Sequence, residues 1–192
     1  MILYCATSNP GKLREFALAS SDSFRIEPLP GLEAIAPPEE TGTTFEENAI
    51  SKALAYGSHT REWLFAEDSG LEVDALCGEP GVRSARYAGP DATDESNNRL
   101  LLGRMGNEAD RRARFVCVIA LVHEGRVIQT FRGTVEGEIL RAPTGTQGFG
   151  YDPLFYYPPF ASSFGEADPE LKQAVSHRGC ALRSLADYMQ SV

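Results

Sequence analysis

The chain has 192 residues, of which 42% are hydrophobic, and a formal net charge of −9 at pH 7. This length predicts a single domain over residues 1–192. No stretch is apolar enough to span a membrane, and the first apolar run is too short for a signal peptide. We therefore expect a cytoplasmic protein. The acidic charge disfavours polymeric nucleic acid as a partner, whereas a small polyanion could bind in a local cationic pocket with a divalent metal.

Strand and helix signals alternate through the first half of the chain, as in an α/β protein. Apolar runs predict strands at residues 2–7, 24–28, 63–67, 114–123 and 126–140. Helical spacing of apolar residues predicts helices at residues 10–20, 44–58, 93–105 and 177–190. A short polar turn joins the last two strands, which indicates a long antiparallel hairpin. We therefore expect an α/β fold in which a mixed β-sheet is flanked by helices.

The four cysteines of the chain lie tens of residues apart, and they are Cys5, Cys77, Cys117 and Cys180. They form no CxxC pair and have no histidine at a metal-ligand spacing, which argues against a zinc site. We expect free and mostly buried thiols, as in a reducing compartment.

The turn between the first predicted strand and helix has the features of a phosphate site. It consists of Ser8, Asn9, Pro10, Gly11 and Lys12. Asn9 favours the N-cap and Pro10 the first helical position, so the turn should end at a helix N-terminus whose unpaired N–H groups attract phosphate. Lys12 adds a cation. The turn is not a Walker A loop, and the alternative is an ordinary strand-to-helix turn with a solvated lysine.

Carboxylates occur at the start of the second predicted helix and after the third predicted strand. Glu46 and Glu47 belong to the first group, Glu67 and Asp68 to the second. Acids at the carboxyl end of a strand are where α/β proteins place ligand chemistry, and such oxygens suit Mg²⁺. Alternatively, the two helix acids only favour the helix N-terminus, and residues 68–70 form a turn. We favour a functional Asp68, because a charge beside a hydrophobic strand needs a partner.

Two segments near the C-terminus could bind a nucleotide. Residues 145–153 combine glycines with Phe149 and Tyr151, whose rings could stack on a base or fill the core. Farther on, Ser176 can cap the last helix, which would place His177 and Arg178 in its first turn. These two donors could contact carbonyl oxygens or phosphate, or else form a solvated basic turn.

Six segments, in this order, resemble the inosine triphosphate pyrophosphatase family. They are TSNPGK at 7–12, TFEENAISKA at 44–53, AEDSGLEVDAL at 66–76, PGVRSARYAG at 80–89, GFGYDPLF at 148–155 and SHRGCAL at 176–182. Together they cover nearly the whole chain. Two positions depart from the family's pattern: Gly165, and Glu67, where the family commonly has Asp.

The resemblance implies an elongated mixed α/β fold, a homodimer, and Mg²⁺-dependent hydrolysis of ITP, dITP and XTP to the monophosphate and pyrophosphate. It implies that Asp68 is the general base and a metal ligand, with Glu47 and Glu67 as further metal ligands. The substrate-binding residues that it implies are Thr7, Ser8, Asn9, Pro10, Gly11, Lys12, Ser69, Phe149, Gly150, Tyr151, Asp152, Lys172, His177 and Arg178. The alternatives are a septum-formation-type nucleotide pyrophosphatase, acting on pyrimidine or modified nucleotides, and a non-catalytic nucleotide sensor.

Overall fold

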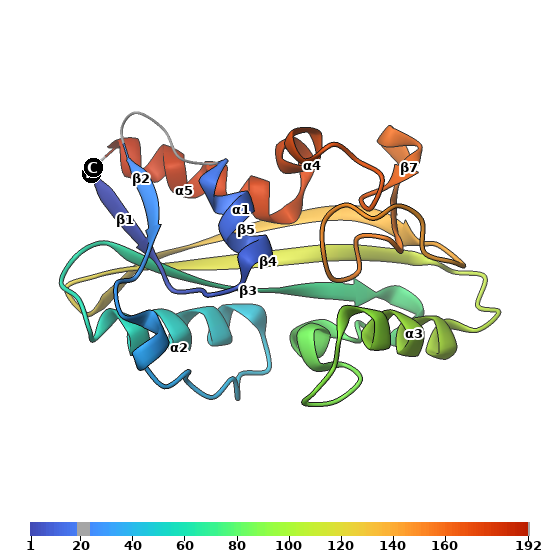
Figure 1. The fold of residues 1–192 in the computed structure, drawn as a ribbon, viewed down its shortest axis with the longest axis horizontal. Helices are drawn as coiled ribbons and strands as arrows, with labels where there is room; N and C mark the ends of the chain where they lie inside the picture. Colours follow the sequence, from blue (N-terminus) through green and yellow to red (C-terminus); the bar gives the residue numbers. More distant parts are fainter. Residues whose placement is uncertain (19–23, 192) are drawn as a thin grey trace.

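The computed structural model describes residues 1–18 and 24–191 of the chain. The strands in these residues form a seven-stranded sheet in the order β2-β1-β3-β4-β5-β6-β7. They are β1 (Ile2–Cys5), β2 (Arg25–Pro28), β3 (Leu64–Val73), β4 (Arg112–His123), β5 (Arg126–Ile139), β6 (Phe155–Tyr157) and β7 (Ser162–Ser163). The α-helices are α1 (Pro10–Ala17), α2 (Phe45–Gly57), α3 (Asp94–Met105), α4 (Pro169–Val175) and α5 (His177–Ser191). Figure 1 shows α2 and α3 on one side of the sheet, and α1, α4 and α5 on the other.

The predicted fold class is confirmed. β1 pairs in parallel with β2 and β3, whereas the other neighbouring strands pair antiparallel, so the sheet is mixed. β4 and β5 form the expected long hairpin, which gives the molecule its elongated shape (Figure 1). Three predicted helices also agree with α2, α3 and α5 to within one residue at each end.

The main departure from the sequence prediction concerns β3. The strand expected at residues 63–67 continues to Val73, so Glu67 and Asp68 lie inside it and not after its end. β4 supplies an antiparallel partner along its whole length, from Leu64 opposite Val122 onwards, and this continuous hydrogen bonding keeps polar residues within the strand. The interpretation of residues 68–70 as a turn is therefore wrong.

Other elements depart less from the predictions. The helix expected at residues 10–20 ends at Ala17, and residues 19 and 20 of that prediction lie outside the described part of the chain. No sequence pattern predicted α4, β6 or β7. These elements are seven, three and two residues long, and β6 and β7 form by pairing with β5 and with each other.

The core lies on both faces of the sheet, because successive side chains of a strand point to opposite sides. On one face, Phe65 packs in a cluster with Phe16 of α1 and Leu182 of α5. On the other, Ala66 packs in a cluster with Ala53 of α2. Over the described residues, no helix combines the length and apolar character that crossing a membrane requires.

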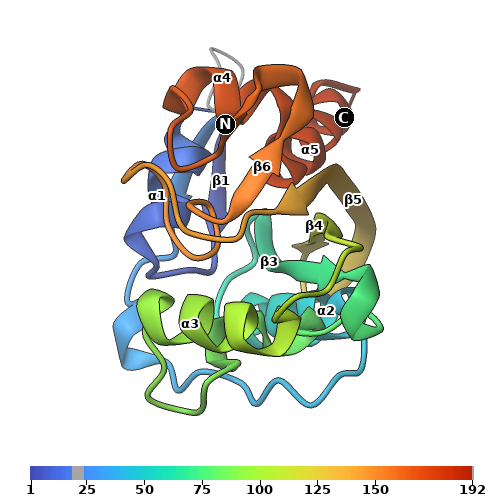
Figure 2. The ribbon, with the colours of Figure 1, turned by 90° about the vertical axis from the view of Figure 1, so that its right-hand side faces the viewer.

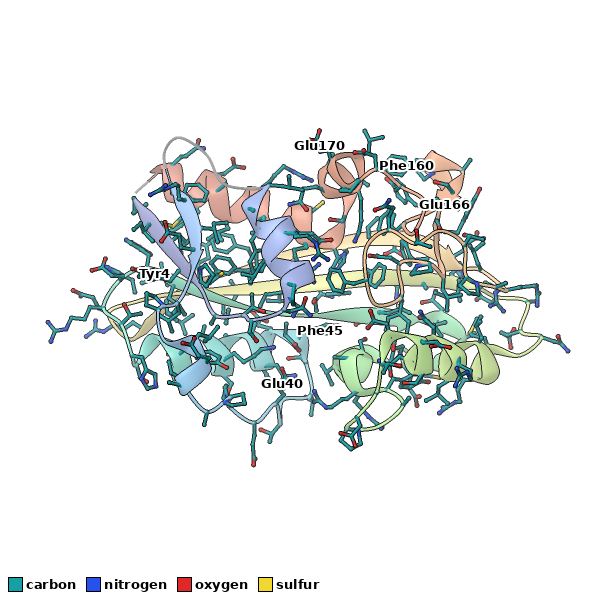
Figure 3. The ribbon with its side chains drawn as sticks, viewed as in Figure 1. Tyr4, Glu40, Phe45, Phe160, Glu166 and Glu170 are labelled. Carbon is teal, nitrogen blue, oxygen red and sulfur yellow. The ribbon has the colours of Figure 1, made fainter. Side chains whose placement is uncertain are left out.

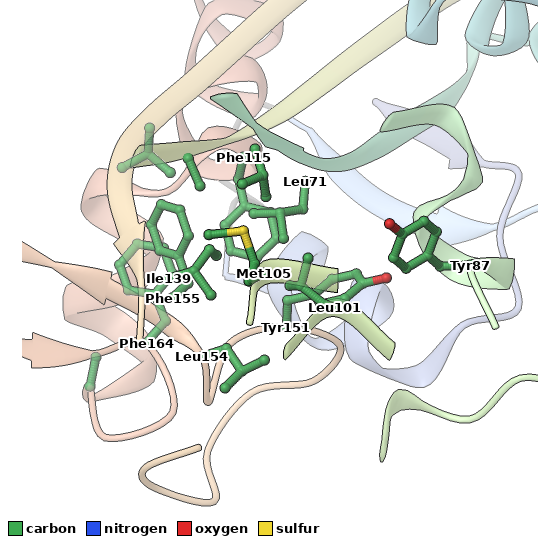
Figure 4. Close-up of a cluster of buried hydrophobic side chains, with 14 residues drawn as sticks. Leu71, Tyr87, Leu101, Met105, Phe115, Ile139, Tyr151, Leu154, Phe155 and Phe164 are labelled. Atoms are coloured by element: carbon green, nitrogen blue, oxygen red, sulfur yellow. The ribbon is translucent and has the colours of Figure 1, made fainter. Parts of the chain in front are cut away.

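A third cluster of buried side chains lies at the far end of the sheet (Figure 4). It joins Leu101 and Met105 of α3 to Phe115 of β4 and Phe155 of β6. α3 is thereby fixed against the sheet. The cysteines of the described chain are free thiols; Cys5 and Cys117 are buried, as expected, whereas Cys77 is exposed.

Candidate active site

A pocket of about 290 Å³ opens beside the edge of β3. β1 pairs with β3 only at Leu64 and Phe65. On the same side of β3, the Leu71 N–H donates to the Ser84 hydroxyl. The part of β3 between Phe65 and Leu71 therefore faces the pocket on this side. The starts of α1, α3 and α5 border the pocket, together with the segment before β6. Figure 2 shows α1 and α3 facing each other at this end of the molecule.

Ten of the predicted substrate-binding residues line this pocket, although they come from distant parts of the sequence. They are Asn9, Lys12, Ser69, Phe149, Gly150, Tyr151, Asp152, Lys172, His177 and Arg178. Thr7, Ser8, Pro10 and Gly11 belong to the adjoining turn and to the first residues of α1. The structure therefore brings together the residues that sequence reasoning treated as separate segments.

The start of α1 is closed by its own cap. Asn9 Oδ1 accepts the N–H of Gly11 at 2.8 Å and that of Lys12 at 3.1 Å, and the Asn9 N–H donates to Thr7 Oγ1. The predicted N-cap at Asn9 is confirmed. The expectation that this terminus has unpaired N–H groups is wrong at Gly11 and Lys12, because the Asn9 side chain pairs with both. A phosphate would reach these two groups by displacing the Asn9 side chain.

Glu67 joins the cations of α1 and α5. Lys12 Nζ lies 2.7 Å from Glu67 Oε1, and Arg178 Nε lies 3.4 Å from Oε2. Cys117 Sγ donates to the same Oε2 at 2.9 Å. Burial by itself raises the pKa of Glu67, but the charges of Arg178 and Lys12 outweigh it and hold that pKa well below its ordinary value. Glu67 is therefore an ionised anchor for both cations.

Glu15, on α1, is a second anionic anchor. Its carboxylate accepts from Lys172 Nζ at 2.8 Å and is paired with the Arg178 guanidinium. Lys172 Nζ also donates to Asp152 Oδ2 at 2.7 Å. Burial by itself raises the pKa of Glu15. The charges of Arg178 and Lys172 outweigh this effect and lower the pKa to about 2. These pairs connect α1, α4, α5 and the glycine-rich segment into one buried network.

Phe149 covers the start of α1 and is only partly buried. A Cβ placed on Gly11 would lie 2.6 Å from Phe149 Cδ1, so the ring rests directly on this glycine. Lys172 Nζ and Arg178 Cζ lie 5.4 and 5.5 Å from the ring centroid. Both distances suit cation–π contacts. The ring therefore joins the predicted phosphate turn to the cationic side of the pocket.

Tyr151 has a different position. Its ring belongs to the buried cluster in Figure 4, and its hydroxyl donates to the Ser84 carbonyl at 2.8 Å. The following residue, Asp152, accepts the N–H of Phe149 at 2.8 Å. Of the two aromatic residues predicted to stack on a base, Tyr151 fills the core, whereas Phe149 lies at the pocket surface.

His177 brings a neutral imidazole to the pocket wall. Its ring stacks on Phe115 at a centroid distance of 4.7 Å. Burial, reinforced by the charge of Arg178, holds the pKa of His177 well below its ordinary value. Within the described residues its Nδ1 is buried without a hydrogen-bond partner. Arg178, in contrast, is engaged by Glu67 and Glu15 and by the Ser69 hydroxyl.

Asp68 lies on the other face of β3 from Glu67, as strand alternation requires. Lys52 Nζ, on α2, donates to Asp68 Oδ1 and to Glu40 Oε1, both at 2.9 Å. Asn48 Nδ2 donates to Asp68 Oδ2 at 3.1 Å. One ammonium group thus holds two carboxylates together beside the open edge of β3.

The two carboxylates differ in their protonation equilibria. Burial raises the pKa of Asp68 above its ordinary value, and Lys52 offsets only part of this effect. Burial also raises the pKa of Glu40, but Lys52 and Arg86, which lies 2.5 Å away, lower it more. Figure 3 shows Glu40 on the α2 side of the sheet. Mg²⁺ is usually held by one or two carboxylates with water and phosphate, so this pair fits its chemistry.

Glu47 lies away from this pair. Its Oε2 accepts the N–H groups of Thr43 at 2.7 Å and Thr44 at 3.2 Å, so the carboxylate caps α2. No three His, Cys, Asp or Glu side chains are grouped as metal ligands within residues 1–18 and 24–191. The structure thus does not bring Glu47, Glu67 and Asp68 together, because the first caps a helix and the other two lie on opposite faces of a strand.

Among the residues of the site that sequence reasoning missed are three charged residues that pair with predicted or neighbouring site residues: Glu15, Glu40 and Lys52. Glu15 follows Lys12 by three positions and Lys52 follows Asn48 by four, so each shares a helix face with a site residue, and this spacing was a usable signal. Glu40 lies in a proline-rich loop without periodicity. Its place beside Asp68 therefore had no local signal in the sequence.

The fold and the pocket define an α/β protein whose pocket is lined by cations and aromatic rings, a chemistry that suits a small anionic ligand. The comparisons with known proteins specify its family. The chain belongs to the Ham1 family, whose model matches residues 3–188. The relationship expected from the six sequence segments is thereby confirmed.

Similar proteins match almost the full length of the chain. A protein of Acidobacterium capsulatum, named dITP/XTP pyrophosphatase, is 50% identical over 96% of each chain. A protein of Exiguobacterium with the same name is 47% identical over 96% of this chain and 95% of its own. The solved structure of the Ham1 protein of Staphylococcus aureus matches with a TM-score of 0.89 and 41% identity, over 100% of this chain and 99% of its own. That of a Coxiella burnetii HAM1 protein matches with a TM-score of 0.90 and 40% identity over both full chains.

Proposed function

We propose that this protein hydrolyses non-canonical purine nucleoside triphosphates, namely ITP, dITP and XTP, to the monophosphate and pyrophosphate. The observation that carries the proposal is the pocket itself, where Lys12, Lys172 and Phe149 meet beside β3, the strand that bears Asp68. The cations suit phosphates, and the ring suits a base. The names of the similar proteins point to two of these substrates, dITP and XTP.

Asp68 is the proposed general base. It removes a proton from a water molecule whose oxygen attacks the α-phosphorus, and the bond from that phosphorus to the bridging oxygen breaks, which releases pyrophosphate. Lys52 and Asn48 hold both carboxylate oxygens of Asp68 in place. Mg²⁺, when bound, would neutralise phosphate charge, and Glu40 with Asp68 is the carboxylate pair best arranged to hold it.

Base selection is proposed to depend on His177. A purine with an oxygen at position 6 needs a hydrogen-bond donor there, and the protonated ring nitrogen of a neutral imidazole can supply one. Arg178 pairs with Glu15, Glu67 and Ser69, so most of its donors are engaged and its proposed role is to orient the site. An amino group at position 6 of the purine would leave this His177 donor without an acceptor, which disfavours ATP.

Three further properties belong to the proposal. A homodimer and Mg²⁺ as the metal are taken from the family resemblance, and the donor chemistry of Glu40 and Asp68 supports the metal. A cytoplasmic location agrees with the free thiols of the described residues. No observation favours the septum-formation-type alternative.

A nucleotide panel with Mg²⁺ tests the proposed function. Pyrophosphate and monophosphate are measured separately for ITP, dITP, XTP, ATP, GTP and pyrimidine triphosphates. We expect release from the first three at rates well above the others. Release of phosphate only after addition of inorganic pyrophosphatase identifies pyrophosphate as the product. Binding without turnover would indicate a nucleotide sensor, and preference for pyrimidines would indicate the septum-formation-type activity.

A further inference from the structure

One face of α3 holds Gly150 from both sides. Asp94 Oδ2 accepts the Gly150 N–H at 2.6 Å, and Asn98 Nδ2 donates to the Gly150 carbonyl at 3.0 Å. Asp94 and Asn98 are four residues apart, so they lie on the same face of the helix. The peptide groups before and after Gly150 are therefore both fixed by α3. Phe149 and Tyr151 are attached directly to these two peptide groups.

The segment around Gly150 needs such external contacts. Gly145, Gly148 and Gly150 have φ angles of 78°, 72° and 62°, in the region that glycine adopts readily. A chain with this freedom loses much conformational entropy when it is ordered. Asp152 and Tyr151 already hold the far side of the turn, through the Phe149 N–H and the Ser84 carbonyl. The hydrogen bonds from Asp94 and Asn98 restrain the same turn on its other side, which faces α3.

α3 is itself rigidly placed. Leu101 and Met105 are buried in the cluster of Figure 4, and Asn97 is hydrogen bonded to Ala85 and Ala88 of the preceding segment. The helix can therefore serve as a rigid support for the turn around Gly150. A carboxylate that accepts from an N–H forms one of the stronger kinds of hydrogen bond in proteins.

We propose that Asp94 and Asn98 are positioning residues that set the orientation of the Phe149 turn and thereby the affinity for the nucleotide base. They act through Gly150, to which both are hydrogen bonded. The inference rests on the proposed function, since it assumes that the base lies against Phe149. It assigns to α3 a role in substrate binding beyond its contribution to the core.

Steady-state kinetics with dITP tests the inference. Asp94→Ala should raise KM roughly tenfold, as expected for one lost hydrogen bond to a charged group, and should leave kcat within about twofold, because base binding contributes equally to ground and transition states. Asp94→Asn keeps an oxygen that can accept the Gly150 N–H, so its KM should stay within about threefold of the wild-type value. Asn98→Ala should raise KM by a smaller factor, about threefold, because its bond is between uncharged groups.

Glu95 provides the matched control. It also lies in the first turn of α3, where its charge favours the helix N-terminus, but it pairs with Arg99. Glu95→Ala should therefore leave KM unchanged. If Glu95→Ala and Asp94→Asn raise KM as much as Asp94→Ala, the effect comes from the charge at the helix start, and the inference is wrong. An unchanged KM for Asp94→Ala would overturn it as well.

Amide hydrogen exchange gives a readout without substrate. In protein labelled with ¹⁵N-glycine, Asp94→Ala should accelerate exchange at Gly150, whereas Glu95→Ala should not. Equal exchange in all three proteins would show that Asp94 does not hold the turn, which contradicts the inference. A wild-type protein that hydrolyses none of the nucleotides would overturn the proposed function alone, since the exchange comparison would still decide whether Asp94 restrains Gly150.

Discussion

The ring of Phe149 rests on the backbone of Gly11, although the two residues are far apart in the sequence. A Cβ on Gly11 would lie 2.6 Å from Phe149 Cδ1, which is too close for any methyl group. The predicted phosphate turn and the predicted base platform are therefore in direct contact. A change in either one should alter the other.

Replacing Gly11 by alanine tests this contact. The added methyl group should displace the Phe149 ring and raise KM for dITP about tenfold, since base–aromatic stacking contributes about 1–3 kcal/mol. Folding should be preserved, because alanine favours a helix. Gly103→Ala in α3 is the control, since a Cβ there meets nothing within 4 Å. In a Phe149→Ala background the Gly11→Ala change should add little; an undiminished effect there would mean that the ring does not mediate it.

Replacing Asp68 by asparagine should nearly abolish turnover while nucleotide still binds. The amide cannot take a proton from water, and loss of a general base lowers rates by about 10²- to 10⁴-fold. Turnover is measured from pyrophosphate release, binding by calorimetry and folding by thermal denaturation. A variant that is folded and retains turnover within about threefold of wild type would remove Asp68 from this role.

Glu40 and Glu47 are expected to differ in their effect on the metal requirement. Glu40→Gln should raise the Mg²⁺ concentration for half-maximal activity by about tenfold or more, because the carboxylate beside Asp68 is lost. Glu47→Ala should leave that concentration nearly unchanged but lower the urea concentration at which half of the protein unfolds, because it removes part of the cap of α2. Titration of Mg²⁺ and urea denaturation separate the two effects. The opposite result would restore Glu47 as the metal ligand.

Replacing Glu15 by glutamine should destabilise the protein at pH 7 by about 1–3 kcal/mol, the range for hydrogen bonds to charged groups. The pKa of Glu15 is lowered from 4.5 to about 2 in the folded protein, so its ionised form stabilises the fold above pH 4.5. This stabilisation declines as the pH falls from 4.5 toward 2, where the folded protein also binds the proton. Urea denaturation of both proteins should therefore show a difference in unfolding free energy that shrinks over this pH range.

The exposed Glu62 supplies a control for that experiment. Glu62→Gln should change the free energy of unfolding by less than about 0.5 kcal/mol at any pH. A Glu15→Gln difference that stays constant from pH 7 to pH 3 would show that the lost stability does not come from the ionised carboxylate.

Much of the fold was predictable from local sequence patterns. The caps at Asn9 and Ser176, the apolar runs of the hairpin and the periodicity of α2 and α5 each lie within a few neighbouring residues, and the structure agrees with them. The extension of β3 was not predictable, because Glu67 and Asp68 interrupt its apolar pattern. Its continuation depends on β4, which comes about fifty residues later in the chain.

The candidate site divides in the same way. The sequence by itself determined which segments carry cations, carboxylates and rings, since residue type and local spacing are visible in it: Lys12, Asp68, Phe149 and His177 are examples. Only the tertiary structure decided which of them meet. Strand alternation separates Glu67 from Asp68, packing sets Glu40 against Lys52, and the Tyr151 side chain is buried in the core whereas that of Phe149 is only partly buried. These contacts depend on how segments that are distant in the sequence pack against one another on the sheet, and a local pattern of residues does not predict that packing.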